Sequence, residues 1–148
     1  LLEDSGLITI KNPGFIIPVM DYHMQRVSLR TGCVEIEDKQ LSSKLQQKIL
    51  IESDEEIRQS CIEAMKIIAS VAQIPVLKMN DIFYMLGRSC CNQKPLCVSN
   101  QCDKTPCSLT LTLHLTSHSE CLLLPICAGS TSVDYRTLKE PAVLTHFY

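Results

Sequence analysis

Five of the chain's nine cysteines lie within eighteen positions, between Cys90 and Cys107. Four or more thiols on one short loop repel one another once they are ionised, and a bound cation or metal cluster removes that repulsion. This loop is therefore the most strongly constrained part of the chain. We expect it to fold around a metal centre.

The spacing of the loop suggests which cysteines bind the metal. With Cys90 as the first ligand, the pattern is C-x6-C-x4-C-x4-C through Cys97, Cys102 and Cys107. Four thiolates are the ligand set of a [4Fe–4S] cluster, which is the cofactor that we expect. Zinc takes the same set, although the short C-x2-C pairs of many zinc sites are absent from the sequence, and free or redox-active thiols are a third interpretation. Cys91 is an alternative first ligand in place of Cys90.

The remaining composition describes an ordinary globular domain. The chain has 148 residues, of which 45% are hydrophobic and 20% charged, so it is neither disordered in composition nor too short for a core. The net charge of −2 means that any nucleic-acid-binding surface would be local. No apolar run has the length of a membrane span, and we expect no membrane association.

The cysteines also bear on the compartment. Their number is odd, and the N-terminal sequence lacks the basic region and apolar stretch of a secretory signal. A disulfide framework is then the weaker interpretation, and we expect an intracellular, reducing compartment, either cytoplasm or nucleus. Cys33 and Cys61 lie in amphipathic or apolar surroundings and are expected to be core residues.

Residues 1–107 have the pattern of a mainly α-helical domain that ends in the cysteine loop of residues 90–107. Asp21 is a good N-cap for the first helix, and Gly32 lies where that helix would end in the left-handed conformation. A third helix opens with a serine and a glutamate in capping-box spacing, at positions 53 and 56. The four expected helices cover residues 20–32, 39–50, 53–73 and 80–88.

Residues 108–148 form a C-terminal extension of different character. The segment "SLTLTLHLT", residues 108–116, alternates leucine with polar residues, which is typical of a half-buried strand. The segment "ECLLLPIC", residues 120–127, is its expected partner, so the extension is predicted to be a β-hairpin with an irregular tail. Cys121 and Cys127 then fit a strand pair or a buried core, and a second metal site with a nearby histidine is the alternative.

Further features surround the cysteine loop. Gly87-Arg88 ends the fourth expected helix, six residues separate Cys90 from Cys97, and Lys94-Pro95 comes shortly before Cys97. In these features the loop resembles the iron–sulfur loop of the endonuclease III branch of base-excision DNA glycosylases, whose pattern is C-x6-C-x2-C-x5-C. The chain departs from that pattern at the third and fourth cysteines, where four residues stand in place of two and of five.

A second motif supports the same resemblance. The family carries its essential aspartate in a segment Val-Asp-Thr-His, followed by Arg-Val and Asn-Arg. The segment "PVMDYHMQRVSLRTG" places residues in the same register. These residues are Asp21, His23, Arg26, Val27 and Arg30.

The resemblance covers residues 15–107 and implies a function. It implies an iron–sulfur enzyme of the helix-hairpin-helix superfamily that cleaves an N-glycosidic bond in DNA during base-excision repair. Asp21 would be the catalytic carboxylate, which stabilises the positive charge that develops on the sugar. The loop would present basic side chains to DNA phosphates, and in this chain these are Arg88, Lys94 and Lys104.

Two other functions stay open. The segment around Asp21 also resembles, more weakly, the queuosine-salvage nucleoside hydrolases, which would act on a free modified nucleoside instead of DNA. A non-catalytic, metal-stapled module that binds nucleic acid or protein is the third possibility. The Gly-rich DNA-binding hairpin of the glycosylases is not found before Asp21, and Lys11 is too close to Asp21 to be a lyase amine. We therefore expect the chain to be the C-terminal part of a longer enzyme.

Overall fold

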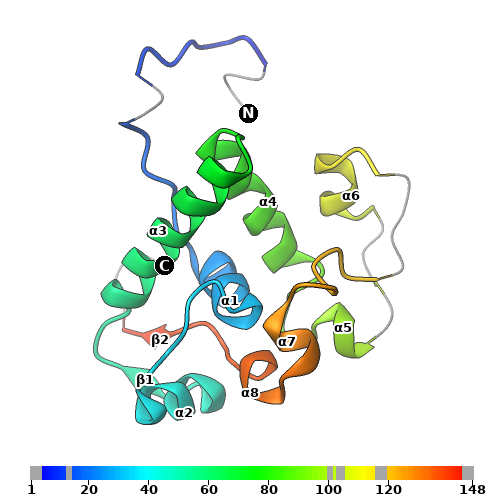
Figure 1. The fold of residues 1–148 in the computed structure, drawn as a ribbon. Helices are drawn as coiled ribbons and strands as arrows, with labels where there is room; N and C mark the ends of the chain where they lie inside the picture. The colour runs from blue at the N-terminus through cyan, green and yellow to red at the C-terminus, as the bar shows by residue number, and fades with distance from the viewer. Residues whose placement is uncertain (1–4, 13–14, 100–101, 103–105, 116–119, 145–148) are drawn as a thin grey trace.

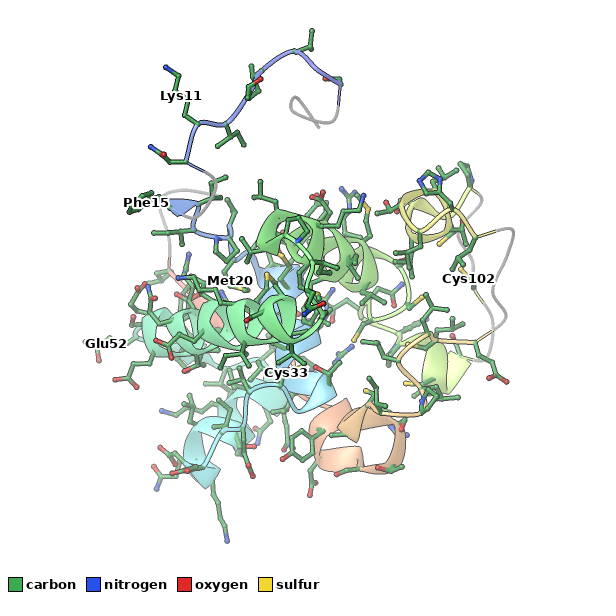
Figure 2. All side chains as sticks on the ribbon, turned by 45° about the horizontal axis from the view of Figure 1, so that its top comes forward. Lys11, Phe15, Met20, Cys33, Glu52 and Cys102 are labelled. Carbon is green, nitrogen blue, oxygen red and sulfur yellow. The ribbon has the colours of Figure 1, made fainter. Side chains whose placement is uncertain are left out.

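A computed structural model describes residues 5–12, 15–99, 102, 106–115 and 120–144. Over these residues the fold is mainly α-helical, as the sequence predicts (Figure 1). The segment that carries Lys11 and Phe15 extends away from the helices (Figure 2). The helices themselves are arranged around α1, Tyr22–Thr31, which lies in the middle of the molecule.

Both predicted ends of α1 are confirmed. The carboxylate of Asp21 accepts a hydrogen bond from the backbone N–H of Met24 at 3.0 Å, which is the bond of an N-cap. Gly32 follows the last turn with φ of 81°, a left-handed conformation that glycine adopts without steric strain. Local sequence signals thus determine where the central helix begins and ends.

α1 is buried on nearly every side, which its sequence does not lead one to expect. Its apolar residues Met24, Val27 and Leu29 are at most 1% exposed, and four polar residues of the same helix are buried as well. The helix contacts α3, Glu55–Val71; α4, Val76–Arg88; α7, Ala128–Thr131; and α8, Val133–Arg136. Buried polar groups require partners: the two arginines find theirs in the candidate site, whereas Gln25 donates to Asp54 at the start of α3. The four buried polar residues are Gln25, Arg26, Ser28 and Arg30.

The other predicted helices exist, with different ends. α2 spans Lys39–Gln47 and is capped by Asp38, and α4 begins directly after Pro75 instead of near Asn80. The predicted capping box of α3 is not formed among the described residues: the hydroxyl of Ser53 accepts the backbone N–H of Glu55. Cys61 is fully buried on α3, and Cys33 packs against the core, as predicted.

A short parallel pair of strands joins the C-terminal segment to the helical body. β1, Leu50–Ile51, follows α2, and β2, Ala142–Val143, lies beside it in the register Leu50 to Ala142. The C-terminal segment therefore returns to the junction of α2 and α3 (Figure 1).

The predicted strand over residues 108–116 is wrong in its described part, residues 108–115. This segment begins with a helix, α6, Ser108–Thr112. Leu109 is fully buried and Leu113 packs against the core, whereas Leu111 is 64% exposed, so the leucines follow the helical i, i+4 period. The threonine hydroxyls bond to carbonyls three and four residues back, Thr110 to Cys107 and Thr112 to Ser108. Tertiary packing has thus overridden a strictly alternating pattern.

The predicted partner of that strand, residues 120–127, is not a strand either, so the hairpin is not formed. Cys121 to Ile126 form a series of turns that leads into α7. One further short helix, α5, Leu96–Ser99, lies in the cysteine loop.

In the described part of the chain, no single helix is both long enough and apolar enough to cross a membrane. α3 and α4 reach such a length and composition only as a pair, and the pair is bent by 118°.

Candidate functional site: a cysteine pocket at the end of the central helix

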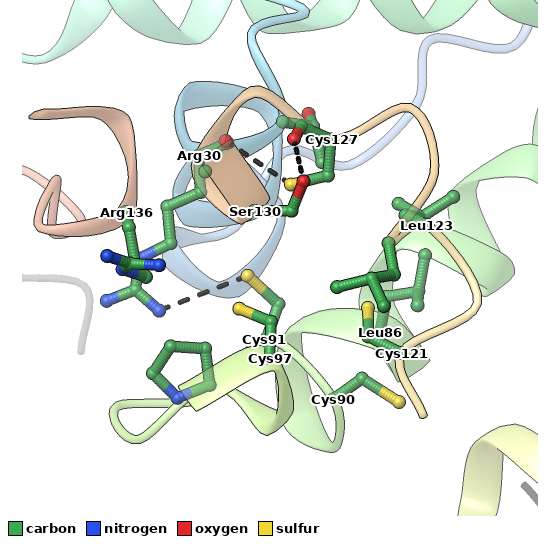
Figure 3. A pocket seen from close by; sticks show the side chains of 14 residues that line it. Arg30, Leu86, Cys90, Cys91, Cys97, Cys121, Leu123, Cys127, Ser130 and Arg136 are labelled. Atoms are coloured by element: carbon green, nitrogen blue, oxygen red, sulfur yellow. Dashed lines mark hydrogen bonds between the residues drawn. The ribbon is translucent and has the colours of Figure 1, made fainter. Parts of the chain in front are cut away.

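One pocket brings together five of the nine cysteines (Figure 3). Its wall comes from four parts of the chain: the C-terminal turn of α1, the end of α4 with the loop that follows, the segment that leads into α7 with the start of that helix, and Arg136 at the end of α8. The space within it that the centre of a water molecule can occupy is small, about 20 Å³. The cysteines that line it are Cys90, Cys91, Cys97, Cys121 and Cys127.

Two arginines of α1 hold the first part of the cysteine loop. Nε of Arg26 donates to the Cys91 carbonyl at 2.9 Å, and its Nη2 donates to the Gly87 carbonyl at 2.7 Å. One turn later, Nη1 of Arg30 donates to the Asn92 carbonyl at 2.6 Å. Because both guanidinium groups come from the rigid central helix, the backbone on either side of Cys91 is fixed relative to α1.

Arg30 also positions the last part of the pocket. Its Nε donates to the Leu138 carbonyl at 2.7 Å, and its own carbonyl accepts the thiol of Cys127 at 3.5 Å. Gly129 lies so close to this helix end that a Cβ there would stand 2.8 Å from the Arg30 carbonyl oxygen. The segment that carries Cys127 is therefore seated directly on the last turn of α1.

The thiols point in different directions (Figure 3). The sulfurs of Cys91, Cys97, Cys121 and Cys127 border the pocket, whereas that of Cys90 is turned away from the first two. Within the described residues, no three His, Cys, Asp or Glu side chains are grouped so as to hold one metal ion as they stand.

The environment of these thiols changes their acidity. A hydrogen bond from the Cys90 thiol lowers the pKa of Cys121 to about 6 against the opposing effect of burial. Burial raises the pKa of Cys97, and it raises that of Cys91 to about 11 although the nearby Arg30 lowers it. Cys121 is thus the thiol of the pocket that ionises most readily.

The four predicted ligands do not all line this pocket. Cys90 and Cys97 do, but Cys102 lines a neighbouring hollow with Lys94, and Cys107 is buried. Cys107 receives hydrogen bonds from Cys102 and Ser89. The structure therefore places Cys102 and Cys107 together, and Cys90 lines both this pocket and the neighbouring hollow.

A second group of residues surrounds Asp21. The ring of His23 lies 4.0 Å from that of Tyr22 and 6.0 Å from that of Tyr84, centroid to centroid. The phenol oxygen of Tyr84 accepts a hydrogen bond from Arg88 at 2.9 Å. Asp21 and Arg88, two predicted site residues 67 positions apart in the sequence numbering, both lie close enough to His23 for their charges to affect its pKa.

His23 is tied to the central helix. Its Nδ1 lies 3.1 Å from Nη2 of Arg26, a contact in which the arginine donates and the imidazole accepts. Burial lowers the pKa of His23, and the positive charges of Arg26 and Arg88 lower it further, while Asp21 acts in the opposite direction. We conclude that His23 is a neutral acceptor at neutral pH.

Two of the three predicted nucleic-acid-binding residues are described by the structure. Arg88 and Lys94 are both exposed. The backbone N–H of Lys94 donates to the side-chain oxygen of Asn92 at 2.9 Å, which holds the loop in a turn. Lys104 lies outside the described residues.

Glu140 is a buried acid that the sequence analysis did not single out. Its carboxylate accepts hydrogen bonds from Arg26 at 2.7 Å, from Lys48 at 2.8 Å and from Gln93 at 2.8 Å. Burial raises the pKa of Glu140, but the bonds from Lys48 and Arg26 outweigh it and lower the pKa to about 2. No local signal marks this residue, because its partners come from three distant segments.

Cys121 and Cys127 were also assigned no firm role from the sequence. One signal could have pointed to them: five residues separate Cys121 from Cys127, and five also separate Cys91 from Cys97. The same spacing occurs twice, and the structure brings both pairs to one pocket.

Known proteins give no further assignment. No protein-family model matches the sequence, and no similar curated protein or solved structure was found. The function must therefore be argued from the residues and their geometry.

Proposed function

We propose that the chain is part of an iron–sulfur DNA glycosylase of base-excision repair, with Asp21 as its catalytic carboxylate. The observation that carries this proposal is the link between the two motifs. α1 begins directly after Asp21, and Arg26 and Arg30 of the same helix bind the backbone of the cysteine loop. The two segments that resemble the glycosylase family are thus parts of one structural unit.

The position of Asp21 suits the chemistry. Cleavage of an N-glycosidic bond builds positive charge on the sugar, and a fixed carboxylate beside the anomeric carbon stabilises that charge. Asp21 lies at the N-terminus of α1, where the helix dipole favours a negative group. The Met24 amide holds Oδ1, whereas Oδ2 has no hydrogen-bond partner among the described residues. The second oxygen is therefore available to a substrate.

The surroundings of Asp21 suit a nucleic acid. Tyr22 is 45% exposed directly beside the carboxylate, and aromatic rings of this kind stack on unpaired bases. A base that is to be excised must first leave the duplex stack, so a stacking surface next to the carboxylate supports such a substrate. Arg88 and Lys94 provide exposed positive charge for the phosphates.

The thiol chemistry of the pocket suits a [4Fe–4S] cluster. All nine cysteines are free thiols, so ligands are available without reduction of a disulfide, in keeping with a reducing compartment. A single zinc ion needs four sulfurs within about 2.3 Å of one point. Each cysteine of a four-iron cluster binds a different iron, so the four sulfurs need not meet at one point, and the pocket offers its thiols from two separate segments. The cluster would cross-link the loop and so support the position of Lys94.

The catalytic role of Asp21 can be tested against a second aspartate that also caps a helix. Asp21 caps α1 and Asp38 caps α2, and asparagine caps helices as well as aspartate does. We expect Asp21→Asn in the full-length protein to reduce the excision of damaged bases from duplex DNA at least about 100-fold. Asp38→Asn should leave the rate unchanged. A folded Asp21→Asn protein that excises bases at the wild-type rate would exclude the proposal.

A second experiment separates DNA from a free nucleoside as the substrate. Lys94→Ala should weaken duplex binding and reduce the slope of log K against log salt concentration by about 1. Lys78→Ala removes an exposed lysine on α4 and should change neither quantity. Hydrolysis of a free modified nucleoside, with no binding to duplex DNA, would favour the nucleoside-hydrolase alternative.

A further inference from the structure

We propose that the metal centre is held by the two cysteine pairs that have five intervening residues. Its ligands are then Cys91, Cys97, Cys121 and Cys127. This assignment rests on the proposed cofactor, but it does not depend on the role of Asp21 or on the substrate. It replaces Cys102 and Cys107, which the loop spacing favours, with two residues of the C-terminal extension.

The sulfurs of the four proposed ligands lie around one pocket. The four side chains come from two separate segments and border one pocket (Figure 3). Rotation of a cysteine about χ1 between staggered positions redirects its sulfur without moving the backbone. A bound centre therefore requires these sulfurs to turn and the pocket to widen, while the hydrogen bonds from Arg26 and Arg30 to backbone carbonyls stay in place.

Both segments are anchored to the same helix. Arg26 fixes the carbonyl of Cys91, and Gly129 packs so closely on the last turn of α1 that a Cβ there would stand 2.8 Å from the Arg30 carbonyl oxygen. The hydrogen bond from the Cys127 thiol to that carbonyl is given up when the thiol loses its proton to a metal. Metal ligands need a scaffold that holds them at defined positions. Cys102 lines a different hollow, and no hydrogen bond from α1 holds it within the described residues.

Cationic side chains lie next to the proposed ligands. Four thiolates give a metal centre a net negative charge, and nearby cations offset it. Arg30 and Arg136 both line the pocket, and Nη1 of Arg30 lies 3.9 Å from the sulfur of Cys91. No cationic side chain of the described residues lines the other hollow except Lys94.

Cys90 has a different task in this arrangement. Its sulfur is turned away from those of Cys91 and Cys97, and its thiol hydrogen-bonds to Cys121. A donor bonded to a ligand sulfur holds that ligand in orientation, as outer-shell groups do in other metal sites. We assign Cys90 this positioning role beside Cys121.

The assignment has a consequence for folding. A centre with these ligands would tie the C-terminal segment to the loop that follows α4, across the end of α1. Binding of a metal by ligands from distant segments adds its free energy to folding. Metal loss should therefore loosen residues 120–138, whereas a centre held by residues 90–107 alone would leave them unaffected.

The first test measures bound metal in variants purified without oxygen. We expect the bound metal per chain, measured as iron and sulfide or as zinc, to fall at least about tenfold in Cys97→Ser and in Cys127→Ser relative to the wild type. The matched control is the double variant Cys102→Ser/Cys107→Ser, which should retain the wild-type content and the same visible absorption. Full metal content in Cys127→Ser, or its loss in the double variant, would overturn the assignment.

The second test uses the wild-type protein, so that no variant has to fold. Thiols are alkylated with iodoacetamide before and after removal of the metal with a chelator, and the modified peptides are identified by mass spectrometry. Alkylation of Cys121 and Cys127 should increase on chelation, and that of Cys102 should not. If the protein contains metal and chelation does not change the alkylation of Cys121 and Cys127, the ligand assignment is wrong but the proposed cofactor stands. If the wild-type protein contains no metal, the proposed cofactor is wrong as well. The proposed catalytic role of Asp21 is tested separately, by the excision of bases.

Discussion

Gly87 lies against the backbone of His23 at the crossing of α4 and α1. A Cβ at position 87 would stand 2.6 Å from the His23 carbonyl oxygen and 2.9 Å from its carbonyl carbon. These are backbone atoms of a central, fully packed helix, so they cannot move aside independently. The close contact brings the end of α4, and with it Arg88 and the cysteine loop, next to the residues around Asp21.

Gly87→Ala should therefore destabilise the protein. On an open helix face the exchange of glycine for alanine stabilises by up to about 1 kcal/mol. Here the added methyl group forces α4 away from α1, and we expect a loss of about 2 kcal/mol in the free energy of unfolding. Chemical denaturation monitored by circular dichroism measures it. Lys78→Ala on the exposed face of α4 should change stability by less than about 0.5 kcal/mol. A Gly87→Ala protein as stable as the wild type would mean that the helices do not meet at this point.

Glu140→Gln tests the buried ion pair at the centre of the fold. The substitution leaves Arg26 buried, at 1% side-chain exposure, without its anionic partner. Removal of one partner of a buried pair destabilises strongly, and we expect a loss of about 3 kcal/mol. The exposed Glu52→Gln substitution should have little effect. If both variants denature at the same urea concentration as the wild type, the pair of Arg26 and Glu140 contributes nothing to the free energy of unfolding.

The same carboxylate predicts how stability depends on pH. The pKa of Glu140 is about 2 in the folded protein, against an ordinary value of 4.5 for glutamate. A carboxyl group with a lowered folded-state pKa contributes stability that is complete above its unfolded-state pKa. That contribution is lost as the pH falls from about 4.5 to about 2. The stability difference between wild type and Glu140→Gln should therefore shrink over this range, as thermal unfolding in a series of buffers would show. A stability difference that does not change over this pH range would contradict the lowered pKa of Glu140.

The ends of α1 could be predicted because their signals are local. Asp21 and Gly32 act within three residues of their own positions. The helix α3 begins within two residues of its predicted start, but its predicted capping box could not be relied on, because the carboxylate directly before the helix bonds to other side chains. Asp54 accepts hydrogen bonds from Gln25, 29 residues earlier, and from Arg58 one turn later.

The candidate site shows the same division between local and distant contacts. The position of Cys97 relative to the first cysteines of the loop follows from spacing within one segment. The approach of Cys127 to Arg30 joins residues 97 positions apart, and that of Glu140 to Arg26 joins residues 114 apart. No pattern within a short window specifies such contacts, because they arise only when the C-terminal segment packs on α1.

The segment 108–116 allows the alternating pattern and the observed packing to be tested against each other. In a half-buried strand, Leu109 and Leu111 would share one face, and truncating either would have a similar effect. In α6, Leu109 is fully buried and Leu111 is 64% exposed. We therefore expect Leu109→Ala to destabilise by about 3 kcal/mol and Leu111→Ala by less than about 0.5 kcal/mol. Urea denaturation of the two variants measures this contrast, and equal losses would favour the strand.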